Sequence, residues 1–240
     1  MANSTLTIQK KVTQALFGFG PKPLPRTGPK DRREKILITG TGRAGTTLLV
    51  QLFTVLDFDT GYSVDEAMTD IDPISKAGLE RLDTGPDSPY VIKSPIYADL
   101  LPQLLQDQRL HLRATILPMR DLYAAAQSRR RVTAEAIGAG GAPDDEHPGG
   151  LWLTRSPEEQ EAKLAAQFYK IMHTLTTFGV TPITLEFPRF ARDEAYLHQR
   201  LLPVLRQHGV SRREFRSAFA KVVQTERIHE FPPQGMETAA

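Results

Sequence analysis

The fold is decided by residues 35–48, which read KILITGTGRAGTTL. The opening residues are mostly apolar and β-branched, the composition of a parallel strand that is buried on both faces. Closely spaced glycines then predict a tight turn. A helix is expected from Thr46, because apolar residues recur at helical spacing at Leu48, Leu49, Leu52, Phe53 and Leu56. A strand, a glycine-rich turn and a helix in this order form a cradle for anions, since backbone amides and the positive end of the helix dipole point at one place.

The rest of the chain alternates strands with helices. Further strands are predicted at residues 90–93, 112–117 and 182–187, and Pro118 is expected to close the second of them. Helices are predicted at residues 121–136, 194–208 and 211–225, and another from a capping box of Ser156 and Glu159 to Gly179. Residues 137–150 read as a long loop. The alternation predicts an α/β fold, namely a three-layer α/β/α sandwich with a mostly parallel central sheet.

One folded domain is expected at residues 35–225. Residues 1–34 are basic and rich in Pro and Gly, which predicts an N-terminal arm and linker, and residues 226–240 read as a disordered tail. A weakly amphipathic pattern between Leu6 and Phe17 leaves peripheral contact with a membrane or a partner open.

Composition excludes several classes of protein. The net charge of +2, from 30 Lys and Arg against 28 Asp and Glu, lacks the basic excess of a general nucleic-acid-binding protein. The chain contains no cysteine, which excludes disulfides, thiolate metal sites and cysteine nucleophiles. No apolar run reaches the roughly 18 residues that a transmembrane segment needs, and the N-terminus lacks a signal peptide pattern. A cytoplasmic location is expected.

The glycine-rich turn departs from the phosphate loop of nucleoside triphosphatases at one position. That motif continues Gly-Lys-Ser/Thr, whereas Thr46 follows Gly45 here. The missing lysine disfavours triphosphate and magnesium chemistry, and a cation stands within the loop instead, as Arg43. A dinucleotide-binding loop is a weaker alternative, because no second strand ending in an acid follows at the usual distance.

Residues 42–48 resemble the 5′-phosphosulfate loop of sulfotransferases, in which Arg or Lys precedes Ser-Gly-Thr-Thr and apolar residues. The resemblance implies a P-loop kinase-like fold, 3′-phosphoadenylyl sulfate (PAPS) as co-substrate, and no metal. It assigns donor binding to Gly42, Arg43, Ala44, Gly45, Thr46 and Thr47.

Later segments resemble other parts of the sulfotransferase donor site. Arg120, at a predicted strand end, followed by Ser128 resembles the 3′-phosphate motif, and an arginine can hold a phosphate with its bidentate fork. Of the arginines at 129–131, one is expected to assist this phosphate, because consecutive helical residues point in different directions. Lys93 ends another predicted strand, where many sulfotransferases place a lysine against the reacting sulfate.

The resemblance leaves the general base open. Cytosolic sulfotransferases have a His two residues after the strand-end lysine, a position that Pro95 takes here. Glu66 is the preferred candidate for the base, and the alternatives are Asp65, Tyr97, Asp99 and His147. Residues 137–152 are interpreted as a lid over the acceptor.

The sequence thus predicts a sulfotransferase that moves a sulfuryl group from PAPS to a hydroxyl or amine of a small-molecule, glycan or lipid acceptor. Arg43 and Lys93 would stabilise the negative charge of the transition state. Two alternatives remain: a P-loop nucleotide-dependent phosphotransferase, and a non-catalytic nucleotide-binding or scaffold protein of the same fold.

Overall fold

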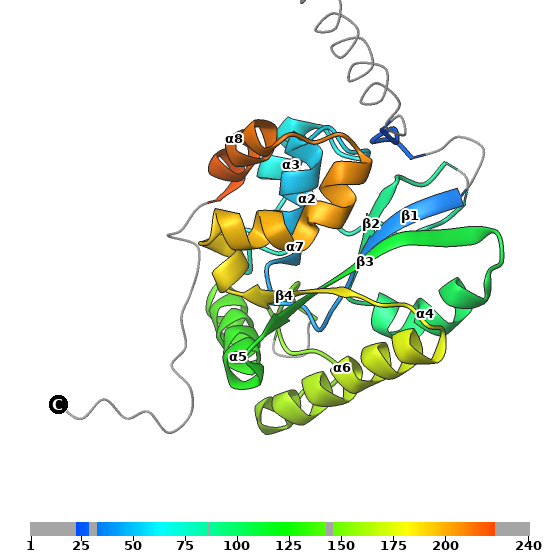
Figure 1. Cartoon of the computed structure of the whole chain (residues 1–240). Coiled ribbons are helices and arrows are strands. Elements are labelled where there is room, and N and C mark those ends of the chain that lie inside the picture. The colour runs from blue at the N-terminus through cyan, green and yellow to red at the C-terminus, as the bar shows by residue number, and fades with distance from the viewer. Residues whose placement is uncertain (1–22, 29–32, 86, 143–145, 224–240) are drawn as a thin grey trace, which may run out of the picture.

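A computed structural model describes residues 23–28, 33–85, 87–142 and 146–223. In this part of the chain four strands form one parallel sheet in the order β2-β1-β3-β4. The strands are β1 (Arg33–Ile38), β2 (Val91–Lys93), β3 (Leu110–Arg120) and β4 (Ile183–Phe187). Helices cover both faces of the sheet (Figure 1). The predicted three-layer α/β/α sandwich with a parallel sheet is confirmed.

The two helical layers have different members. One layer contains α2 (Thr46–Val55), α3 (Val64–Thr69), α7 (Glu194–Gln207) and α8 (Arg212–Val222). The other contains α4 (Tyr97–Gln106) and α6 (Gln160–Thr177), and α5 (Leu122–Gly138) packs against α6. Two short 3₁₀ turns complete the chain, η1 (Pro157–Glu159) and η2 (Arg189–Ala191).

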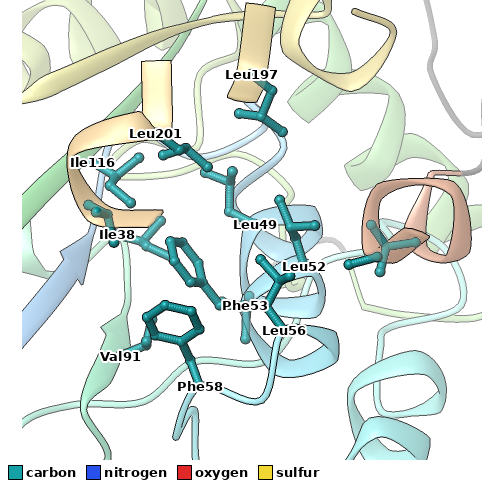
Figure 2. Close-up of a cluster of buried hydrophobic side chains, with 14 of the residues drawn as sticks. Ile38, Leu49, Leu52, Phe53, Leu56, Phe58, Val91, Ile116, Leu197 and Leu201 are labelled. Atoms are coloured by element: carbon teal, nitrogen blue, oxygen red, sulfur yellow. The ribbon is translucent and has the colours of Figure 1, made fainter. Parts of the chain in front are cut away.

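The second half of β1, Ile36–Ile38, is buried on both faces, which explains its apolar sequence. Ile36 and Ile38 pack toward α2, whereas Leu37 packs toward α4 and α6. In Figure 2 Leu49 of α2 lies beside Leu197 and Leu201 of α7, and the ring of Phe53 lies toward Ile38. The apolar face predicted for the first helix therefore forms the centre of the larger core.

The strand order reverses at β1, because β2 lies on one side of it and β3 on the other. Carboxyl ends of parallel strands share one edge of the sheet, and ligands of open α/β sheets bind there, next to such a reversal. The β1–α2 loop, the end of β2 and the β3–α5 corner consequently lie at the same edge.

Two local predictions were wrong. Strand β3 continues through Pro118 to Arg120, because β1 pairs with β3 only as far as Ile116 and the missing proline amide costs no hydrogen bond on that side. Helix α6 begins at Gln160 after the η1 turn, and the capping box is not formed. Ser156 Oγ donates instead to Glu158 Oε2 at 2.9 Å.

The folded domain begins slightly earlier than expected, at Arg33. Residues 23–28, within the predicted linker, pack on the domain: Leu24 N donates to Gln207 O at 2.7 Å, and Arg26 Nη1 donates to Leu56 O at 2.7 Å. The predicted amphipathic stretch and the C-terminal tail lie outside the described residues.

Candidate functional site

The β1–α2 loop has a backbone that only certain residues can adopt. Gly42 and Gly45 have φ angles of 73° and 77°, in the left-handed region that favours glycine. A Cβ at Gly42 would lie 2.6 Å from Arg129 Nη2, and one at Gly45 would lie 2.7 Å from Phe190 Cζ. Helix α2 starts directly after Gly45 with no side-chain cap and no acidic residue in its first turn. Its positive end therefore has no anionic side chain of its own helix against it.

Arg43 connects the two halves of the predicted donor site. Its Nε donates to Ser128 Oγ at 3.1 Å, and its Nη1 donates to Ser75 O at 2.6 Å. Burial, with the nearby Arg120 and Arg131 charges, lowers the pKa of Arg43 to about 10. The guanidinium is still charged at neutral pH, at a cost that a bound anion would relieve.

Arg120 lies at the end of β3, next to the same loop. Its Nη1 donates to Arg43 O at 3.2 Å, and its guanidinium carbon lies 5.1 Å from the centre of the Phe187 ring. Burial, and then the charge of Arg131, lower the pKa of Arg120. Ser128, almost completely buried at 1% exposure, lines the same cavity from α5. The structure thus brings Arg120 and Ser128 together with Arg43, as the sequence predicted.

Lys93 ends β2 in a buried position, 3% exposed. Its Nζ donates to Gly78 O at 2.7 Å and to Glu80 Oε1 at 2.6 Å. Burial lowers the pKa of Lys93, and the Glu80 carboxylate opposes that shift. An antiparallel bridge between Arg81 and Lys93 holds Glu80 beside the lysine. Glu80 was missed from the sequence, because residues 70–90 carry no strand or helix periodicity.

Arg129 is the arginine of the 129–131 run that reaches the site. Its Nη2 donates to Thr41 O and its Nη1 to Gly150 O, both at 2.6 Å, and it lies over the Trp152 ring. Burial and the Arg43 charge lower the pKa of Arg129 to about 9. Its position was readable from the helix, since the buried residues of α5 include Ala125, Arg129, Val132 and Ala136.

The other two arginines of the run form ion pairs outside this site. Arg130 binds Glu161, and Arg131 Nε lies 3.5 Å from Glu135 Oε1. Of the three arginines, Arg129 is the one that lines the cavity, in keeping with consecutive helical residues pointing in different directions. Its assistance to a donor phosphate stays a prediction.

These side chains surround a cavity of about 260 Å³. Its described lining combines cationic side chains with apolar ones. The cations are Arg43, Lys76, Lys93, Arg120 and Arg129, and the carboxylates are Glu80 and Glu146. Apolar surface comes from Leu48, Ile71, Trp152, Phe187, Ala191 and Val222. Such a cavity suits a ligand with several anionic groups and an aromatic or apolar part.

The loop residues predicted for the donor are distributed around this cavity. Gly42, Gly45, Thr46 and Thr47 line it, and Thr47 Oγ1 donates to Gly78 O at 3.3 Å. Ala44 is buried at 1% exposure and does not line the cavity.

The candidate bases are not all at the cavity. Glu66 is exposed and completes a capping box with Ser63 at the start of α3, where Ser63 N donates to Glu66 Oε2 at 2.7 Å. Asp65 is exposed on the same helix, Tyr97 OH accepts from Asp83 N at 2.7 Å, and Asp99 accepts from Lys170. His147 does line the cavity, together with Glu80.

The predicted lid is only partly a loop. Helix α5 extends to Gly138, and residues 143–145 lie outside the described residues. Residues 146–152 contribute His147 and Trp152 to the cavity lining and so cover one side of the site.

Within the described ranges, no group of three or more Asp, Glu, His or Cys side chains could hold a metal ion. Metal independence stays a prediction. No helix in these ranges is long and apolar enough to cross a membrane.

Comparisons with protein-family models, with curated proteins and with solved structures found no match. The class of protein that the fold and the site define is an α/β protein with a cationic cavity at the carboxyl edge of a parallel sheet.

Proposed function

We propose that the protein is a sulfotransferase that uses PAPS and sulfates a hydroxyl or amine of a small-molecule, glycan or lipid acceptor. The observation that carries the proposal is the hydrogen bond of 3.1 Å between Arg43 Nε and Ser128 Oγ. It joins the two segments that resemble the 5′-phosphosulfate loop and the 3′-phosphate motif, although 85 residues separate them in the chain.

The charge of the cavity supports a donor with two anionic ends. The phosphosulfate end would lie on the β1–α2 loop, where Arg43 and the first amides of α2 converge. The 3′-phosphate would lie between Arg120 and Ser128, which provide a guanidinium fork and a hydroxyl. Two anionic groups at these places would offset the mutual repulsion that Arg43, Arg120 and Arg129 experience on burial.

The proposed reaction is an in-line displacement at sulfur. The acceptor oxygen or nitrogen forms a bond to sulfur while the bond from sulfur to the bridging phosphate oxygen breaks. That oxygen leaves with adenosine 3′,5′-bisphosphate, and Lys93 and Arg43 stabilise its negative charge.

Glu80 is the base that the cavity favours. Its carboxylate lies beside Lys93, 2.6 Å from the ammonium, and lines the cavity, whereas Glu66 caps its own helix. The proton of the acceptor would pass to Glu80 as the new bond to sulfur forms.

A transfer assay with ³⁵S-labelled PAPS and a panel of phenols, glycans, lipids and amines tests the function. Labelled product without added metal is expected. The alternatives give other results: magnesium-dependent binding of ATP without binding of adenosine 3′,5′-bisphosphate indicates a phosphotransferase, and donor binding without transfer to the panel indicates a scaffold.

Two matched variants identify the base. Glu80→Gln should lower kcat by about 10²- to 10⁴-fold, the usual contribution of a general base, with the affinity for adenosine 3′,5′-bisphosphate nearly unchanged. Glu66→Gln keeps a capping side chain and should leave kcat close to wild type. A large loss of kcat in Glu66→Gln, with kcat of Glu80→Gln close to wild type, would identify Glu66 as the general base instead.

A further inference from the structure

Backbone carbonyl groups of residues 70–81 accept hydrogen bonds from polar side chains that line the cationic cavity. Ser75 O accepts from Arg43 Nη1 at 2.6 Å. Gly78 O accepts from both Lys93 Nζ, at 2.7 Å, and Thr47 Oγ1, at 3.3 Å. Donor groups from the β1–α2 loop, from α2 and from the end of β2 are therefore all held by one segment.

The segment is shaped to present these carbonyl groups. Asp72 Oδ1 accepts from Ile74 N at 3.0 Å and from Ser75 N at 2.6 Å, which fixes a tight turn just before the Ser75 carbonyl. Farther on, the paired backbones of Arg81 and Lys93 anchor the segment to β2.

The conformation of the segment is strained. Lys76 and Leu79 have φ angles of 56° and 63°, in the left-handed region that side chains disfavour. Strained backbone persists only where surrounding contacts hold it, and here Arg43, Thr47 and Lys93 provide those contacts. Loss of these contacts would allow the segment to relax.

We propose that residues 70–81 are an autoinhibitory strap, whose oxygen atoms stand where anionic oxygens of the donor bind. This inference rests on the proposed function, because it takes the donor to be PAPS. An anionic oxygen forms a stronger hydrogen bond with Arg43 or Lys93 than a neutral carbonyl does, so the donor displaces the strap. Its withdrawal takes the Gly78 carbonyl away from Lys93, while the backbone pairing of Arg81 with Lys93 keeps Glu80 beside the ammonium. The displaced residues then leave room for an acceptor at the Glu80 carboxylate. The donor consequently binds before the acceptor.

Asp72 offers a matched pair of variants. Asp72→Ala removes the oxygen that holds the turn, whereas Asp72→Asn keeps an oxygen at the same place and removes only the charge. If the strap competes with the donor, loosening it must increase donor affinity, since less of the protein is in the closed state. Asp72→Ala should bind adenosine 3′,5′-bisphosphate about threefold to tenfold more tightly than wild type, and Asp72→Asn less than twofold more tightly.

Calorimetry measures these affinities. Unchanged or weaker binding by Asp72→Ala overturns the strap, and so does an equal gain in both variants, because the lost charge would then be the cause. If Asp72 only stabilised the fold, Asp72→Ala would not bind adenosine 3′,5′-bisphosphate more tightly than Asp72→Asn does.

Hydrogen exchange of the wild-type protein tests the same idea without any variant. On addition of adenosine 3′,5′-bisphosphate, amides of residues 72–78 should exchange faster, while amides of residues 42–47 become protected. Protection of both regions together would show that the strap stays closed over the ligand and would overturn the proposal.

The same experiments distinguish a wrong strap proposal from a wrong assignment of PAPS as the donor. If adenosine 3′,5′-bisphosphate binds and residues 72–78 become protected, the donor assignment survives and the strap does not. If the bisphosphate does not bind, the donor assignment fails, and inorganic pyrophosphate then serves as the probe of the cations. Faster exchange at 72–78 with pyrophosphate supports displacement, and no change refutes it.

Discussion

Replacement of Arg43 by alanine should weaken the binding of adenosine 3′,5′-bisphosphate strongly without unfolding the protein. The size of the effect follows from the burial of the guanidinium. A lowering of the Arg43 pKa from its ordinary value to about 10 corresponds to about 3 kcal/mol of disfavoured charge. A bound anion can recover that energy, and the range of roughly 2–4 kcal/mol expected for a charge-assisted contact in a desolvated site agrees with it.

A loss of about 3 kcal/mol corresponds to roughly a hundredfold weaker Kd, which isothermal calorimetry at neutral pH without metal can resolve. Arg43→Lys keeps the charge but loses the guanidinium fork and should lie between wild type and Arg43→Ala. Arg130→Ala is the matched control, because Arg130 pairs with Glu161 outside the site and its loss should leave Kd unchanged. Wild-type affinity in Arg43→Ala would refute the donor site described above.

Three further outcomes are expected. Transfer should decline on the alkaline side as Lys93 loses its proton, and in the residual activity of Glu80→Gln this decline should move to lower pH, because the carboxylate that raises the Lys93 pKa is gone. Leu52→Ala, at a core position with 0% exposure, should lower the free energy of unfolding in urea by about 2–5 kcal/mol; a smaller loss would mean that the core repacks around it. Ser63→Ala should cost about 1 kcal/mol in the same measurement through loss of the α3 cap, with kcat unchanged.

The features predicted correctly from the sequence share one property, which is that their signals are local. The β1 strand and the α2 helix follow from apolar spacing within residues 35–56. Once the sheet is parallel, the residues that end its strands must lie at one edge, and so Arg43, Lys93 and Arg120 come together. The topology of the sheet alone therefore predicts that these three residues lie close together.

The features that were missed depend on contacts between distant segments. Glu80 reaches the site because Arg81 pairs with Lys93, and such a bridge leaves no periodic pattern in either segment. Glu66 is different, because its local sequence pattern already predicted a role as a helix cap rather than as a base. Ser63 and Glu66 stand at the spacing of a capping box, and the structure forms that box.

The two buried arginines of the cavity, Arg43 and Arg129, are hydrogen-bonded in a different way from Arg113, which lies outside it. Outside the cavity, Arg113 is neutralised by a bidentate pair with Glu34. At the cavity, Arg43 and Arg129 are bound by carbonyl and hydroxyl oxygens, which solvate a guanidinium without cancelling its charge.

That difference has a consequence for binding. A carboxylate at Arg43 would neutralise the site and compete with any donor as an equal, whereas a carbonyl yields to a phosphate or sulfate oxygen. Lys93 holds a carboxylate, Glu80, at the one point where the proposed reaction needs a base. The arrangement keeps the positive potential for the anionic donor and places the acidic group where the acceptor proton must go.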